Sequence, residues 1–161
     1  MKNTDFKLLV VALIILSMTS ISCTSDDDSN EEQSEQQIIS QIENNLINGS
    51  WRITEFIDSG EDETNHFVGY NFIFGANGVV TAGNSSSSYE GSWSITGNDN
   101  SDDDDDDDTN DLDFNINFNL SNDFEELNED WDIITHSSNK IELIDISGGN
   151  GETDYLTFEK N

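Results

Sequence analysis

The sequence predicts an all-β protein: an eight-stranded antiparallel up-and-down meander that closes into a barrel, with a short helix at its N-terminal end. Eight short segments alternate between apolar and polar residues with a period of two, which is typical of strands with one buried face. The connections are short except for one acidic loop, so neighbours in sequence should pair as antiparallel neighbours. Closure is favoured because it removes exposed strand edges.

The clearest strand covers residues 112–120, where nine residues alternate strictly between apolar and polar side chains. Less regular alternation predicts seven further strands, over residues 51–57, 67–74, 79–82, 89–96, 131–135, 141–146 and 155–158. Gly, Asn and Ser in the connections are typical turn residues. Residues 122–125 predict a capped helical turn ahead of Trp131.

The predicted helix precedes the first strand. Its apolar residues recur at helical spacing, at Ile38, Ile39, Ile42 and Leu46, and Asn48-Gly49 supplies a stop signal. The helix is therefore short and amphipathic, and we expect it to close one end of the barrel.

The N-terminal segment has the residue pattern of a secretory signal peptide. Two lysines precede the apolar run of residues 8–16, which is too short to span a membrane because spanning takes roughly 20 residues. The chain's only cysteine follows, and Ser20-Ile21-Ser22-Cys23 resembles the lipobox of bacterial lipoproteins. We therefore expect residues 1–22 to be removed and Cys23 to carry lipid. The alternative is an ordinary signal peptide with a chance cysteine.

Acidic and polar residues follow the cysteine. Asp26-Asp27-Asp28 resembles the export tag of Bacteroidota-type surface lipoproteins, which implies a lipid-anchored outer-membrane protein on the cell surface. The alternatives are a periplasm-facing protein and a plain solvated linker. Residues 23–37 are interpreted as an acidic flexible tether, and residues 38–161 as one barrel domain that is monomeric.

The charge of the chain excludes some partners. Lys2, Lys7 and Asp5 leave with the signal, so the mature chain keeps 34 acidic and three basic residues, a net charge near −31. Nucleic acid binding requires Lys or Arg side chains that neutralise phosphates, and the three that remain, Arg52, Lys140 and Lys160, are too scattered for that. Attachment to a membrane must therefore come from the acyl chains.

Gly49-Ser50-Trp51 resembles the Gly-x-Trp signature that opens the first strand of lipocalins. Together with residues 70–80, 91–93, 130–133 and 156–160, it resembles the lipocalin-like domains of bacterial surface lipoproteins, over about residues 46–161. The resemblance implies an eight-stranded barrel with an interior site for a small hydrophobic molecule. The chain has no arginine near its C-terminus to stack on Trp51, as the lipocalin pattern would have.

Alternation turns a set of aromatic residues inward. The candidates for ligand binding are Trp51, Tyr70, Phe72, Trp93, Phe114, Phe118 and Trp131, and the same alternation turns Phe74, Tyr89 and Phe158 inward. An eight-stranded barrel is just wide enough for its own side chains or for one small ligand. The aromatic residues therefore either line a cavity or fill the core.

The residues predict neither an enzyme nor a cofactor. His66 and His136 lie near strand ends, without the spacing of a zinc site, and no second cysteine is present. The serines of residues 85–88 form a low-complexity loop with no nucleophile elbow.

One loop is strongly acidic. Residues 98–111 contain nine aspartates, seven of them consecutive at residues 102–108, which is typical of a solvated loop. Loose calcium association is the alternative, through Asp102, Asp104, Asp106 and Asp108.

Two hypotheses for the function follow. The first is a non-enzymatic surface lipoprotein whose barrel binds a small apolar ligand. The second is a module with a filled core that meets a protein or a glycan through its exterior. A cavity lined by the inward aromatic residues would distinguish them.

The anchor hypothesis makes a prediction about Cys23. The wild type should incorporate labelled palmitate, whereas Cys23→Ser should not and should become soluble, because the acyl chains supply the membrane affinity. Metabolic labelling followed by membrane fractionation measures both effects. Equal labelling of the two proteins would contradict the hypothesis.

Overall fold

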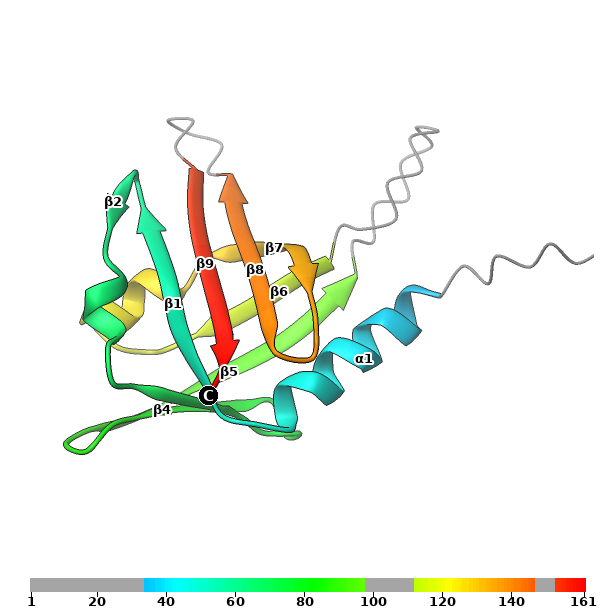
Figure 1. The fold of residues 1–161 in the computed structure, drawn as a ribbon, viewed down its shortest axis with the longest axis horizontal. Helices are drawn as coiled ribbons and strands as arrows, with labels where there is room; N and C mark the ends of the chain where they lie inside the picture. Colours follow the sequence, from blue (N-terminus) through cyan, green and yellow to red (C-terminus); the bar gives the residue numbers. More distant parts are fainter. Residues whose placement is uncertain (1–33, 98–111, 147–152) are drawn as a thin grey trace, which may run out of the picture. The chain divides into compact units, whose positions relative to one another are not determined.

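The computed structural model describes residues 34–97, 112–146 and 153–161, all within the unit Gln33–Asn161. The predicted signal segment, Cys23, the Asp-rich loop and the Gly-rich connection at residues 147–152 lie outside the described residues. The account of the fold below therefore concerns the barrel and the helix that precedes it (Figure 1).

The described residues form an antiparallel barrel. Its strands are β1 (Trp51–Asp58), β2 (Glu61–Asp62), β3 (Asn71–Phe74), β4 (Val79–Gly83), β5 (Ser88–Gly97), β6 (Leu112–Asn117), β7 (Asp130–His136), β8 (Lys140–Ile146) and β9 (Thr153–Lys160). From β3 to β9 each strand pairs with the next, and β1 pairs with both β3 and β9. The predicted eight-stranded meander is confirmed. The additional two-residue β2, which was not predicted, pairs only with β1.

The contact between β1 and β9 closes the barrel. It runs from Trp51 opposite Lys160 to Ile57 opposite Tyr155, whereas β1 meets β3 only where Trp51 lies opposite Phe72. Closure therefore depends on pairing the first strand of the barrel with the last, two segments that are far apart in the sequence.

Two bulges explain why the alternation is less regular in β1 and β7. In β1 the register shifts between Ile53 and Glu55, so the next buried residue after Ile53 is Phe56. In β7 it shifts between Ile133 and Thr135, and Ile134 is 55% exposed. A bulge inserts one extra residue and so interrupts the period of two.

The helix α1 (Glu35–Ile47) begins three residues before Ile38. The backbone N–H of Ser34 donates to the side-chain oxygen of Gln37 at 3.0 Å, as part of a capping box that fixes this start. The buried face of α1 joins the barrel core and packs against β3 and β5, through Ile39, Ile42 and Leu46.

Two short 3₁₀ helices connect strands of the barrel, and the first overlaps the start of a predicted strand. Residues 67–70 were predicted as strand, but η1 (Thr64–Phe67) and a turn precede β3, because Gly69 adopts a φ of +87° that interrupts an extended chain. The strand predicted for residues 112–120 ends at Asn117. The capped turn after Asn122 is confirmed as η2 (Asp123–Leu127), with the Asn122 side chain accepting from the Phe124 N–H at 3.3 Å.

The barrel makes a prediction about Trp131, which is fully buried and donates its indole N–H to the Leu127 carbonyl at 3.1 Å. Trp131→Ala should lower the free energy of unfolding by about 3–5 kcal/mol, because it leaves a large cavity. Ile134→Ala, on the same strand but half exposed, should change it by less than about 1 kcal/mol. Urea unfolding followed by circular dichroism measures both. Equal losses would contradict the inward assignment.

Candidate functional site

The structure places the seven predicted ligand-binding aromatic residues on or beside five strands. Six of them are buried and belong to the core, namely Trp51, Phe72, Trp93, Phe114, Phe118 and Trp131. Tyr70 is only partly buried and packs against the edge of the core beside Tyr89, at 6.1 Å between ring centroids. The inward orientation that alternation predicted is therefore correct for the six buried rings.

The middle of the barrel is occupied by the protein's own rings. Phe158, on β9, has its ring centroid 5.2 Å from that of Phe72, 5.7 Å from Phe74 and 6.1 Å from Phe114. The rings of Phe74 and Phe114 meet edge to face at 5.9 Å. Aromatic pairs at these distances are in packing contact. Two of the candidate lining residues, Phe72 and Phe114, therefore pack against Phe158 in the core.

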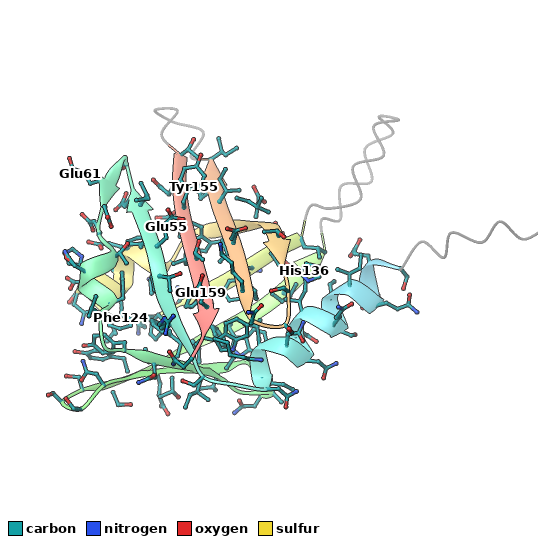
Figure 2. The ribbon with its side chains drawn as sticks, viewed as in Figure 1. Glu55, Glu61, Phe124, His136, Tyr155 and Glu159 are labelled. Atoms are coloured by element: carbon teal, nitrogen blue, oxygen red, sulfur yellow. The ribbon has the colours of Figure 1, made fainter. Side chains whose placement is uncertain are left out.

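The aromatic cluster extends to the two 3₁₀ helices. Phe124 of η2 lies 5.4 Å from Phe67 of η1, and its centroid lies 5.0 Å from Phe118 and 4.9 Å from Tyr89. Figure 2 shows Phe124 on the side of the barrel where η1 and η2 lie next to each other. Ring packing therefore holds these two helices together and against the barrel.

All three indole N–H groups are bonded within the fold. Trp51 donates to the carbonyl of Leu46 at 2.9 Å, and Trp93 donates to that of Gly75 at 3.0 Å. Trp131 donates to a carbonyl of η2 in the same way. Each tryptophan thus ties a strand to a preceding helix or turn, and its N–H is not available to a ligand.

A cation lies over Trp51 although the C-terminal segment contains no arginine. The Lys160 ammonium is 5.0 Å from the centre of the Trp51 ring. It also donates to the carbonyls of Asn45 at 3.2 Å and Ser138 at 2.9 Å. Lys160 therefore links α1, the turn before β8 and the first strand. This role was not predicted from the sequence, because the lipocalin pattern has an arginine at this place.

The exterior of the barrel has a polar hollow of about 230 Å³. It lies over β5, β6 and the start of β7, where the pairing of β6 with β7 runs no further than Asn115 opposite Asp130. The register of β5 with β6 places hydroxyl side chains beside amide side chains in this hollow: Ser92 lies opposite Asn117, and Ser94 lies opposite Asn115. Neutral groups of this kind donate and accept hydrogen bonds, so the hollow suits a hydroxyl-bearing ligand.

Carboxylates lie at one end of the hollow. Glu129 and Asp130 belong to its lining. The pKa of Glu129 is raised, first by burial and then by the negative charges of Asp145, Asp154 and Asp58 and of Asp130. This part of the hollow therefore favours cations and neutral donors over anions.

The structure also brings together three residues that the sequence analysis did not connect. His66 lies between the carboxylates of Glu63 and Glu126, with its Nδ1 at 3.4 Å and 3.8 Å from their Oε2 atoms. Glu63 is three residues from His66 in the sequence, so their contact is local, and it is one of the two contacts in the group. Glu126 comes from η2, and no local pattern predicts that contact. The other histidine, His136, ends β7 (Figure 2).

The remaining predicted sites lie outside the described residues. These are the lipidation site Cys23 and the calcium candidates Asp102, Asp104, Asp106 and Asp108. In the part of the chain that the structure describes, no helix is long and apolar enough to span a membrane.

No protein-family model and no curated protein sequence matches the chain. Among solved structures, the chain is similar to a crystal structure of a DUF4847 family protein from Bacteroides vulgatus. The two share 20% sequence identity with a TM-score of 0.46, and the alignment covers 74% of this chain and 97% of that one.

The filled interior makes a prediction about Phe158. Phe158→Ala should lower the free energy of unfolding by about 3–5 kcal/mol and leave an apolar cavity that binds benzene, whereas the wild type should not bind it. Thermal melting with and without benzene measures both effects. The matched control is Tyr155→Ala, on the same strand but 40% exposed (Figure 2), which should gain no benzene binding. Benzene stabilising the wild type as strongly as Phe158→Ala would contradict the filled core.

Proposed function

We propose that this chain is a non-enzymatic surface lipoprotein whose lipocalin-like barrel is a filled scaffold that recognises a glycan at its polar exterior hollow. Lipid on Cys23 would hold it in the outer membrane, and residues 23–37 would carry the barrel away from the bilayer. The proposed lipid anchor and surface location rest on the signal-peptide pattern, the lipobox and the acidic residues that follow Cys23.

The observation that carries the proposal is the packing of rings around Phe158. Three phenylalanine rings lie within 6.1 Å of it, centre to centre, so the space where a lipocalin-like barrel would hold a ligand contains the protein's own side chains. A filled core supports recognition on the outside of the barrel, because a rigid scaffold can hold exterior side chains in place at little entropic cost.

The chemistry of the hollow favours a glycan over other partners. Its walls offer hydroxyls from Ser92 and Ser94 and amides from Asn115 and Asn117, which match the hydroxyl groups of a sugar. The nearby carboxylates and a formal net charge of −30 disfavour anionic ligands. A neutral sugar is not repelled by these charges.

The second candidate, a small apolar ligand inside the barrel, is favoured by the aromatic character of the interior. Tyr70 and Tyr89 lie half-buried next to Phe124, at 5.1 Å and 4.9 Å between ring centres. Entry of a ligand would require Phe124 to move away from these rings. The two candidates therefore differ in whether apolar probes bind the wild type.

The test is a screen of the purified protein against neutral glycans, followed by titration calorimetry of the strongest binder. Asn117→Ala should weaken binding about tenfold, since one or two hydrogen bonds contribute roughly 1–2 kcal/mol. Asn65→Ala, an exposed asparagine on η1, is the matched control and should bind as the wild type does.

Two outcomes would overturn the proposal. One is glycan binding that Asn117→Ala leaves unchanged, which would place the ligand elsewhere. The other is the absence of glycan binding together with tight uptake of a fluorescent fatty acid by the wild type, which would favour the interior candidate.

A further inference from the structure

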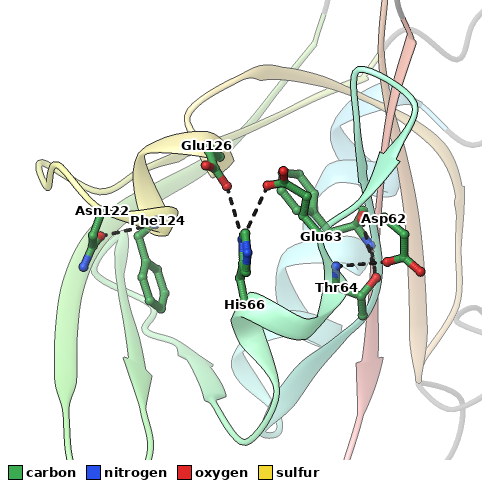
Figure 3. Close-up of polar contacts among 8 residues, drawn as sticks. Asp62, Glu63, Thr64, His66, Asn122, Phe124 and Glu126 are labelled. Atoms are coloured by element: carbon green, nitrogen blue, oxygen red, sulfur yellow. Dashed lines mark hydrogen bonds and ion pairs between the residues drawn. The ribbon is translucent and has the colours of Figure 1, made fainter.

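Three side chains with metal-binding groups converge between the two 3₁₀ helices. His66 belongs to η1, Glu63 immediately precedes η1, and Glu126 belongs to η2. One ligand atom from each residue lies within 4.8 Å of the other two. Figure 3 shows the imidazole of His66 between the two carboxylates.

The spacing is close to that of ligands on one metal ion. Bonds of about 2.0–2.1 Å in tetrahedral geometry place ligand atoms roughly 3.3 Å apart. His66 Nδ1 lies 3.4 Å from Glu63 Oε2 and 3.8 Å from Glu126 Oε2. Small side-chain rotations would therefore bring all three atoms into a single coordination sphere.

The two carboxylate oxygens that face His66 are buried and lack hydrogen bonds. Within the part of the chain that the structure describes, neither Oε2 of Glu63 nor Oε2 of Glu126 has a hydrogen-bond partner. Buried polar atoms are normally satisfied, and an unsatisfied pair aimed at one point needs an explanation. A cation at that point would satisfy both oxygens.

The charges of the two carboxylates also favour a cation at this position. One ligand oxygen of Glu63 lies within 4.8 Å of one ligand oxygen of Glu126. Two carboxylates this close repel each other when both are ionised. A divalent ion would neutralise the pair, since the ligand set carries two negative charges and one neutral imidazole.

The backbone holds the three ligands in place without the ion. The Glu63 N–H donates to the Phe56 carbonyl at 2.9 Å, and the His66 N–H donates to the Glu63 carbonyl at 2.9 Å. On the other side, Asn122 caps η2, and Phe124 packs edge to face on Phe67 at 5.4 Å. The site is thus largely preformed, which lowers the entropic cost of binding.

We propose that Glu63, His66 and Glu126 form a binding site for a divalent transition-metal ion, best matched by Zn²⁺ with water as its fourth ligand, which links η1 to η2. One imidazole and two carboxylates suit Zn²⁺ and its neighbours, whereas Ca²⁺ prefers six to eight oxygen ligands. The proposal rests on different residues from the glycan site and stands independently of it.

The experiment uses the full chain purified in detergent and stripped with EDTA. Titration calorimetry with Zn²⁺ should show one site per chain with a Kd in the micromolar range or tighter. At about a hundredfold excess over Kd, Zn²⁺ should raise Tm by roughly 5–10 °C. His66→Ala and Glu126→Gln should each weaken binding at least about tenfold and lose the Tm increase.

Matched controls separate this site from the aspartates elsewhere. Glu125→Gln, an exposed neighbour of Glu126 on η2, should bind Zn²⁺ as the wild type does. Ca²⁺ should give the same response in the wild type and in His66→Ala. The inference is overturned if the wild type shows no Zn²⁺ binding below millimolar concentration, or if His66→Ala and Glu126→Gln keep the stoichiometry and the Tm increase.

Discussion

The pairing of β1 with β9 is the contact on which the rest of the fold depends. It joins residues 51–57 to residues 155–160 and closes the meander. Closure also places Phe158 in the centre and Lys160 over Trp51. The chain has a single cysteine, Cys23, so it forms no internal disulfide, and packing within the barrel has to supply the stability.

Packing of aromatic rings follows from this closure. A barrel of eight principal strands has a narrow interior, and the inward residues of this chain are large, so the rings of Phe72, Phe74, Phe114 and Phe158 meet one another. The interior therefore serves stability. The polar hollow over β5, β6 and β7, where amides and hydroxyls lie in register, lies outside this packed core.

The two 3₁₀ helices connect core packing to surface chemistry. Phe67 and Phe124 point from η1 and η2 into the same aromatic cluster, and this packing brings Glu126 to within 3.8 Å of His66. One oxygen of each of the two carboxylates is thereby buried beside the other, although both side chains stay partly exposed. Their repulsion and their missing hydrogen bonds are consequences of a contact that the apolar side chains stabilise.

Sequence alone was sufficient for the properties that depend on local pattern. Strict alternation over residues 112–117 and the helical spacing of Ile39, Ile42 and Leu46 predicted which faces are buried, because side-chain direction follows the period of the backbone. Tertiary structure decided whether the inward rings line a cavity or fill it, where bulges shift the register, and which distant residues meet. Glu63 and His66 are near neighbours in the chain, but only the packing of Phe67 on Phe124 brings Glu126 to them, because such contacts depend on three-dimensional packing that no local period encodes.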